Sequence, residues 1–328
     1  MAVVKASEVL RRPLPQAILT RAWRGAAICV SLSLATFAVG SACQIVGGYQ
    51  SFQPHPCNVL PASKIDESGL NVLVLSKQTD GQCYWIDKTE VTVQRYSQFL
   101  EKVTQPIRWQ PDVLTPDAES AQCAWKTSPS NPAQTSDSCT DSTKPESTPF
   151  GAEKPIRCVD WCDARAFCVW AGKDLCGGDV NGSFVLPADV PDQWGFACSP
   201  GGSEYLSGSV PVDGQCNVGL SEAECLVLDT QSQCAPADVG SFPKCSASCG
   251  AVDMIGNVAE WVLSCDATGD GGPGTLCQHR GRSFADDLAA GTCYDMPPAT
   301  DTSDTRDRTI GLRCCAALTA DESNLTQQ

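Results

Sequence analysis

Apolar residues recur at helical spacing in two stretches of the chain. The first stretch follows Thr92, and its apolar side chains stand three and four positions apart, which predicts an amphipathic helix capped by that threonine. Its apolar positions are Val93, Tyr96, Phe99, Leu100 and Val103. The second predicted helix runs from about Asp160 to Ala171, with Gly172 as the expected C-cap.

Shorter patterns surround these two helices. Residues 83–87 read Cys-Tyr-Trp-Ile-Asp, a run of aromatic and β-branched side chains that predicts a strand. Residues 104–154 are rich in Ser, Thr, Pro and Asp and have no periodicity, which predicts a long surface loop stapled by Cys123 and Cys139. After the second helix, short strand-like pieces alternate with loops rich in Gly, Pro and Asp.

The N-terminal segment 1–42 has the layout of a secretory signal: a basic leader, an apolar run at 26–39, and small residues just before Cys43. The apolar run is shorter than the roughly 20 residues that a membrane-spanning helix needs. An uncleaved membrane anchor is the alternative to a signal, and two interpretations of the signal itself stay open. The chain is cleaved plainly after Ala42, or it is processed as a lipoprotein, in which case the acylated Cys43 attaches it to a membrane.

The rest of the chain divides by composition. Residues 43–75 contain adjacent glycines and three prolines and are predicted to be a spacer. The folded domain is then expected over residues 76–318, and residues 319–328 form a polar tail that we expect to be frayed.

Amino-acid composition limits the cellular compartment and the kinds of binding partner that are expected for this protein. The 21 cysteines and two histidines predict structural disulfides in an exported protein, either in the cell envelope or secreted, and disfavour zinc. Segment 1–42 carries five basic residues and one acidic residue, so removing its net +4 changes the net charge from −15 to −19. Such a chain has no basic patch for nucleic acid, whereas it suits calcium.

Four collinear blocks resemble the formylglycine-generating-enzyme (sulfatase-modifying-factor) family. Residues 84–92 resemble its "I-D-K-x-E-V-T" strand and helix start, and residues 155–173 resemble "P-V-x-x-V-S-W-x-D-A … W-A-G-K". The third block comprises Leu186-Pro187 and residues 194–198. The fourth resembles "V-G-S-F-P … D-M-x-G-N-V-W-E-W" over 239–261, and is followed by close relatives of "R-G-G-S-F" at 280–284 and "I-G-F-R" at 310–313.

The resemblance implies a single mixed α+β domain, poor in regular secondary structure, rich in disulfides and distantly related to C-type lectin folds. It also implies two disulfides, Cys168–Cys314 and Cys198–Cys293. Separately, Cys265 and Cys277 are placed to close a glycine-rich loop.

The family's calcium positions map onto two groups of residues. The first group is Asp253, Gly256, Val258 and Glu260, in which two carboxylates and two backbone carbonyls could surround one hard cation. The second group is aligned more loosely and comprises Asn217, Val218, Asp229 and Gln231.

The family's copper-binding cysteine pair has no counterpart. Counted from Phe284, its positions fall on Asp286 and near Gly291, and a copper(I) site needs thiolates. Cys293 and Ser283 are the catalytic candidates that the segment offers, and neither has a suitable partner in the sequence. The family's cleft tryptophan is Ala259 here, and the second glycine of "R-G-G-S-F" is Arg282.

Three functions fit these observations. The first is an exported, non-catalytic module, stabilised by calcium, that binds an unidentified protein or peptide. The second is a formylglycine-generating-type oxidase with a rearranged site, acting on a cysteine of a sulfatase-like protein. The third is a purely structural envelope protein. Because one scaffold can host several functions, the fold alone does not choose among them.

Overall fold

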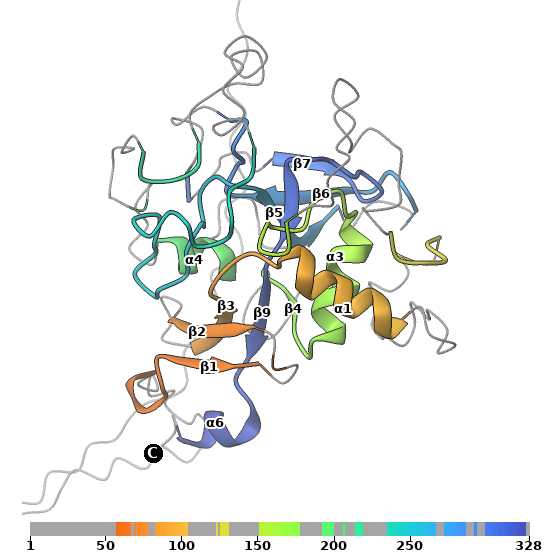
Figure 1. Ribbon diagram of the computed structural model, residues 1–328. Coiled ribbons are helices and arrows are strands. Elements are labelled where there is room, and N and C mark those ends of the chain that lie inside the picture. The colour runs from red at the N-terminus through yellow and green to blue at the C-terminus, as the bar shows by residue number, and fades with distance from the viewer. Residues whose placement is uncertain are drawn as a thin grey trace, which may run out of the picture. The chain divides into compact units, whose positions relative to one another are not determined.

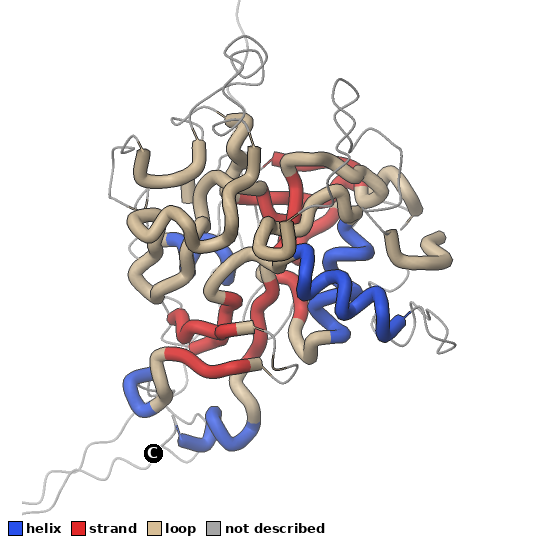
Figure 2. The backbone as a smooth tube through the Cα atoms, viewed as in Figure 1, coloured by secondary structure: helices blue, strands red, loops and turns tan. Residues whose placement is uncertain are grey.

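The computed structural model of the chain is drawn in Figures 1 and 2. It describes residues 57–66, 69, 71–77, 83–103, 123, 125–130, 151–177, 192–199, 206, 214–218, 235–266, 272–286, 292–293 and 299–325. Within these ranges, every helix is too short or too polar to cross a lipid bilayer.

The first sheet is antiparallel and has the strand order β1-β2-β3-β9-β4. Its strands are Ser63–Ile65 (β1), Val72–Lys77 (β2), Cys83–Asp87 (β3), Asp174–Leu175 (β4) and Cys314–Ala317 (β9). All five residues of β3 are buried, which explains why this strand shows no alternation of polar and apolar residues. The predicted strand at 83–87 is therefore present and lies at the centre of a sheet.

The second sheet has the order β7-β6-β5-β8, and only its β5–β8 pair is parallel. Its strands are Ala259–Cys265 (β5), Leu276–Arg280 (β6), Ala299–Thr302 (β7) and Ile310–Leu312 (β8). In this register Glu260 lies between Arg280 of β6 and Gly311 of β8. The "G-N-V-A-E-W" motif thus leads directly into the central strand of this sheet.

Two of the described helices are those that the apolar spacing predicts: α1 (Val93–Val103) and α3 (Trp161–Trp170). They pack through aromatic rings, with the Phe167 centroid 5.9 Å from Tyr96 and 5.7 Å from Phe99. Figure 1 shows the two helices side by side. The short helices α4 (Gln193–Cys198) and α6 (Ala320–Leu325) and a 3-10 turn at Cys57–Val59 complete the described helical structure.

The start of α3 is held by a buried ionic cluster. Asp160 is the N-cap and forms a capping box with Asp163. The Lys126 ammonium contacts both carboxylates and is itself buried. Desolvation, followed by repulsion from Asp163, raises the pKa of Asp160 to about 7.

Seven disulfides cross-link the described residues, which indicates an oxidising environment. They include Cys168–Cys314, Cys198–Cys293 and Cys265–Cys277. The predicted staple between Cys123 and Cys139 is wrong, because Cys123 is bonded to Cys162 at the start of α3. Spacing along the chain favours a local pair, whereas the fold brings the loop back onto the helix.

Two predicted boundaries also differ from the structure. Strands β1 and β2 begin within the segment 43–75 that composition marks as a spacer, and Cys57 is tied to Cys83 of β3. The predicted polar tail contains α6, where Glu322 pairs with Lys64 at 2.7 Å and accepts a hydrogen bond from Trp85. These three short elements left no periodic signal, and they are held by contacts with other segments.

Candidate functional site

The turn before β5 is made of left-handed backbone. Asp253, Gly256 and Asn257 have φ angles of 57°, 78° and 59°. For Asp253 and Asn257 this conformation costs roughly 1–2 kcal/mol each relative to the right-handed region, and Asp and Asn tolerate it better than most residues. The "D-M-I-G-N" sequence is therefore suited to a tightly coiled turn that aims polar groups inward.

Glycine is required at position 256 by a close approach of another chain segment. A Cβ atom on Gly256 would lie 2.5 Å from the carbonyl oxygen of Asn217, and Asn257 N–H donates to that same oxygen at 2.9 Å. The Asn217 side chain in turn donates to Asn257 Oδ1 at 3.0 Å. Asn217 and Val218, predicted for a second calcium site, thus pack directly against the first predicted site.

The other two residues of the second predicted site, Asp229 and Gln231, lie outside the described residues. In the described part of that site, the carbonyl oxygen of Asn217 accepts a hydrogen bond from the Asn257 amide of the turn.

The loop after β6 packs on the other side of the turn. The carbonyl of Gly281 accepts from Gly256 N–H at 2.8 Å, and a Cβ on Gly281 would lie 2.7 Å from the carbonyl oxygen of Met254. The close-passing glycine of the "R-G-G-S-F" motif is therefore present as Gly281. Arg282 follows it with a φ of 58°, so the replaced second glycine leaves an arginine in left-handed backbone.

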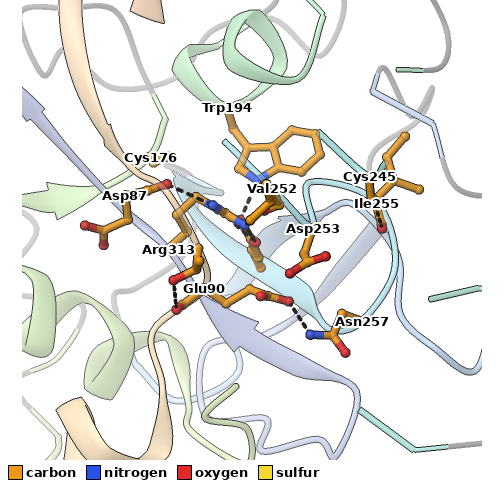
Figure 3. A network of polar contacts seen from close by, with 12 residues as sticks. Asp87, Glu90, Cys176, Trp194, Cys245, Val252, Asp253, Ile255, Asn257 and Arg313 are labelled. Atoms are coloured by element: carbon orange, nitrogen blue, oxygen red, sulfur yellow. Dashed lines mark hydrogen bonds and ion pairs between the residues drawn. The ribbon is translucent and has the colours of Figure 1, made fainter. Parts of the chain in front are cut away.

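Glu260 is buried and contacts Arg313 and Trp194, which belong to the polar network drawn in Figure 3. Its Oε1 accepts from Arg313 Nη2 at 2.8 Å, and its Oε2 accepts from Trp194 Nε1 at 2.7 Å, while Arg313 Nε is 3.0 Å from both oxygens. Burial alone would lower the pKa of Arg313, but the Glu260 carboxylate outweighs burial and raises it. This pair is a fully formed, charge-assisted contact.

Arg313 also holds two backbone carbonyls. Its Nη1 donates to the carbonyl of Asp87 and its Nη2 to that of Val252, both at 2.8 Å. One guanidinium thus connects β3, the turn and β5, and no donor of this arginine points to Glu90 or Asp253 in the described contacts.

Asp253 and Glu90 are buried beside this pair but are less well satisfied. Asp253 Oδ2 accepts from Gly240 N–H at 2.5 Å, and Glu90 Oε1 accepts from the Asn257 side chain at 2.9 Å. The second oxygen of each carboxylate, Asp253 Oδ1 and Glu90 Oε2, has no hydrogen-bond partner. Burial raises the pKa of Asp253 to about 6, and burial followed by repulsion from Asp253 raises that of Glu90 well above its usual value.

A calcium ion fits only part of the predicted ligand set. Asp253 offers a buried oxygen without a hydrogen bond, which is the kind of atom a hard cation would take. Glu260 does not, because both of its oxygens are engaged by Arg313 and Trp194. In the part of the chain that the structure describes, no group of three or more His, Cys, Asp or Glu residues is arranged to hold a metal.

In the segment that corresponds to the family's copper site, the candidate side chains have other bonding partners. Asp286 accepts from the Ser283 amide and from Ser283 Oγ, both at 2.8 Å, so the serine is bonded to a carboxylate and not to a histidine. His279 contacts Asp301 through Nε2 at 3.0 Å instead. Ala259 is buried at the start of β5. The sulfur of Cys293 is bonded to Cys198.

A thiol lies close to that disulfide. Cys249 is half-buried, and its Sγ is 3.5 Å from the carbonyl oxygen of Ala197, the residue before Cys198. Burial raises the pKa of Cys249, so at neutral pH this group is mainly the thiol and a weak nucleophile.

Sequence reasoning missed Glu90, Asn257 and Arg313 as members of this site. All three stand inside motifs that the resemblance uses, but a motif does not tell which of its polar residues are buried together. The available signal was a charge next to apolar residues: Arg313 stands between Leu312 and Cys314, and Glu90 precedes Val91.

Comparisons with known proteins agree with the motifs. The model of the sulfatase-modifying factor enzyme 1-like domain matches residues 63–318. The chain is 27% identical over 171 residues to an inactive C-alpha-formylglycine-generating enzyme 2 of Bos taurus, a match that covers 50% of each chain. It is 28% identical over 124 residues to hercynine oxygenase of Mycobacterium tuberculosis, covering 34% of this chain and 22% of that protein.

The chain therefore spans half or less of the length of these two relatives. Among solved structures, that of PvdO from Pseudomonas aeruginosa is similar with a TM-score of 0.46 at 18% identity, covering 79% of this chain and 99% of the other.

Proposed function

The chain belongs to the sulfatase-modifying factor enzyme 1-like family, and from that premise we propose that it is an exported, non-catalytic member that binds a protein or peptide and is stabilised by calcium. The observation that carries the proposal is the state of Cys293. Its sulfur is bonded to Cys198, and Asp286 stands where the first thiolate of the family's copper site is expected.

Copper chemistry of the family's type needs two sulfur ligands on a soft metal. A carboxylate at position 286 is a hard ligand, and this one is already hydrogen-bonded to Ser283. A disulfide sulfur is not a thiolate and does not replace the missing ligand. The remaining residues therefore suit a structural or binding role better than copper-dependent oxidation.

Calcium would contribute stability in this proposal. Asp253, with the backbone carbonyls of Gly256 and Val258, would hold the ion, which would supply positive charge beside a buried carboxylate. Glu260 would take part only by giving up its contacts with Arg313 and Trp194. The ion would act on the turn 253–257 and on the segment at Asn217 that packs against it.

Export and ligand binding rest on the sequence. The layout of residues 1–42 supports export, either as a secreted protein or as an envelope lipoprotein anchored through Cys43. We propose that a protein or peptide ligand binds either the long segment 104–154 or the family's cleft, whose expected tryptophan is Ala259 here. The strongly acidic chain favours partners other than nucleic acid.

The proposal is tested with the processed protein and its disulfides intact. With copper(I), oxygen and a cysteine-containing sulfatase peptide, we expect no oxygen consumption and no formylglycine by mass spectrometry. Calcium at about 100 times its Kd would stabilise the fold by about 2.7 kcal/mol, so chelation should lower the Tm by roughly 5–10 °C. Turnover that disappears in Cys293→Ser would contradict the non-catalytic assignment.

The position of Cys249 favours one alternative function, a formylglycine-generating-type oxidase with a rearranged site. Attack of the Cys249 thiolate on Cys198 would form a Cys249–Cys198 disulfide and release Cys293 as a thiolate, with no net oxidation. In that case Cys249→Ser should remove turnover as completely as Cys293→Ser does. A purely structural envelope protein would show neither turnover nor stabilisation by calcium.

A further inference from the structure

Two carboxylate groups lie near each other in the core of the molecule, and each has one oxygen without a hydrogen-bond partner. Glu90 is 0% and Asp253 2% exposed, and the oxygens Glu90 Oε2 and Asp253 Oδ1 accept no hydrogen bond. The two side chains come from segments far apart in sequence, and Figure 3 shows their carboxylates next to each other. A buried carboxylate oxygen without a donor is costly, so its place in a well-packed core needs a physical reason.

The charges in this core do not balance. Three carboxylates, those of Glu90, Asp253 and Glu260, are buried near the guanidinium of Arg313. Arg313 is committed to Glu260 and to two backbone carbonyls, as described above. The remaining pair of carboxylates therefore lacks about two positive charges when both are ionised.

The geometry of the pair points to a cation. We infer that Glu90 Oε2 and Asp253 Oδ1 together hold a divalent cation, so that Glu90 takes the ligand role that the family resemblance implies for Glu260. This inference rests on the calcium part of the proposed function and changes its ligand set.

Both carboxylates are already oriented for such a role. One oxygen of each is fixed by an N–H donor, namely the Asn257 side chain on Glu90 and the Gly240 amide on Asp253. The other oxygen of each carboxylate accepts no hydrogen bond. Two carboxylates neutralise a 2+ ion, and the remaining oxygens of a six- to eight-fold shell would come from backbone carbonyls and water.

The competing explanation is one proton shared by the two carboxyl groups. A shared proton satisfies the same two oxygens and needs no metal, but it predicts that calcium has no effect at this pair. It also predicts that replacing Glu90 by glutamine, which removes the repulsion, leaves every calcium response unchanged.

The test is calcium titration of the processed, disulfide-bonded protein, by calorimetry and by thermal unfolding, in four variants. Glu90→Gln is uncharged, nearly isosteric and still accepts from Asn257, so it should fold. Asp253→Asn is its counterpart in the pair. Glu260→Gln is the matched control, because it removes a carboxylate from the same core but not from the pair. Glu90→Asp keeps the charge and withdraws the oxygens by one methylene.

We expect Glu90→Gln and Asp253→Asn each to weaken calcium binding at least tenfold, and Glu90→Asp to weaken it less. Glu260→Gln should lower the Tm without calcium but keep the calcium-induced shift. If Glu260→Gln loses binding while Glu90→Gln retains it, Glu90 is not a ligand and the calcium part of the proposed function survives. If the wild-type protein shows no response to calcium, both ideas are wrong and the shared proton is favoured.

Discussion

Glu260 and Asp253 stand in the same stretch of chain and are both almost fully buried, yet they are satisfied differently. Glu260 has three close contacts with Arg313 and one with Trp194, whereas Asp253 keeps one oxygen without a donor beside the equally unsatisfied Glu90. The first arrangement is complete within the protein and belongs to the scaffold. The second is incomplete, and the difference separates a structural pair from a candidate site.

The largest effect is expected from breaking the Arg313–Glu260 pair, which is fully satisfied within the protein. Arg313→Met removes the guanidinium that neutralises Glu260 and caps the carbonyls of Asp87 and Val252. An uncompensated buried charge costs about 3–5 kcal/mol. We expect a loss of that size in the free energy of unfolding, measured by urea denaturation. A loss below about 1 kcal/mol would mean that the pair is not a structural centre.

A smaller effect is expected from removing a single hydrogen-bond donor to Glu260. Trp194→Phe keeps most of the ring volume but deletes the Nε1–H that donates to Glu260 at 2.7 Å. Leaving a buried acceptor short of a donor costs about 1–3 kcal/mol. Trp170→Phe is a suitable control, since Trp170 is only partly buried and packs in the α1–α3 cluster. Equal losses in the two variants would indicate a packing effect only.

The unsatisfied carboxylate of Asp253 should make the free energy of unfolding depend on pH. The folded-state pKa of Asp253 is raised from 3.8 to about 6, so its contribution to stability is fully present below about pH 4 and is lost as the pH rises through 6. Without calcium, we expect the free energy of unfolding to fall by about 1–3 kcal/mol across that window on account of this group. Asp253→Asn should remove this component of the slope in urea-denaturation series at several pH values.

Asp160 provides an internal check on that slope. Its pKa is raised to about 7, so the fall in the free energy of unfolding that Asp160 causes continues to higher pH than that of Asp253. This fall should persist in Asp253→Asn. Asp160→Asn should remove it while leaving the lower-pH component in place. If Asp253→Asn left the whole pH profile unchanged, Asp253 would not be a destabilised carboxylate.

The smallest effect is expected from adding calcium to the wild-type protein near pH 5. Protons compete with the cation for carboxylates of raised pKa, so the calcium-induced Tm shift should shrink by more than half between pH 7.5 and pH 5. A shift that is independent of pH would place the ion away from Asp253 and Glu90. Thermal unfolding in matched calcium and chelator buffers gives both values.

Much of the local structure could be predicted from the sequence. The strand at 83–87 follows from its aromatic and β-branched side chains, and the helices after Thr92 and Asp160 follow from side-chain periodicity and capping residues, which act within a few positions. Other short elements, such as β1, β4 and α6, left no such signal. The Cys123–Cys162 bond was missed for a related reason, because it depends on how a long segment returns to α3.

The sequence by itself determined the family, the disulfide-rich α+β scaffold and the glycine-asparagine turn, because these are written in contiguous motifs and in backbone preferences at single positions. Only the tertiary structure decided how the buried charges are shared. Which carboxylate Arg313 neutralises, and which is left without a donor, depends on distances among residues 90, 253, 260 and 313. Those distances are set by packing between separate sheets and turns, and electrostatic energies in a low-dielectric core change steeply with them.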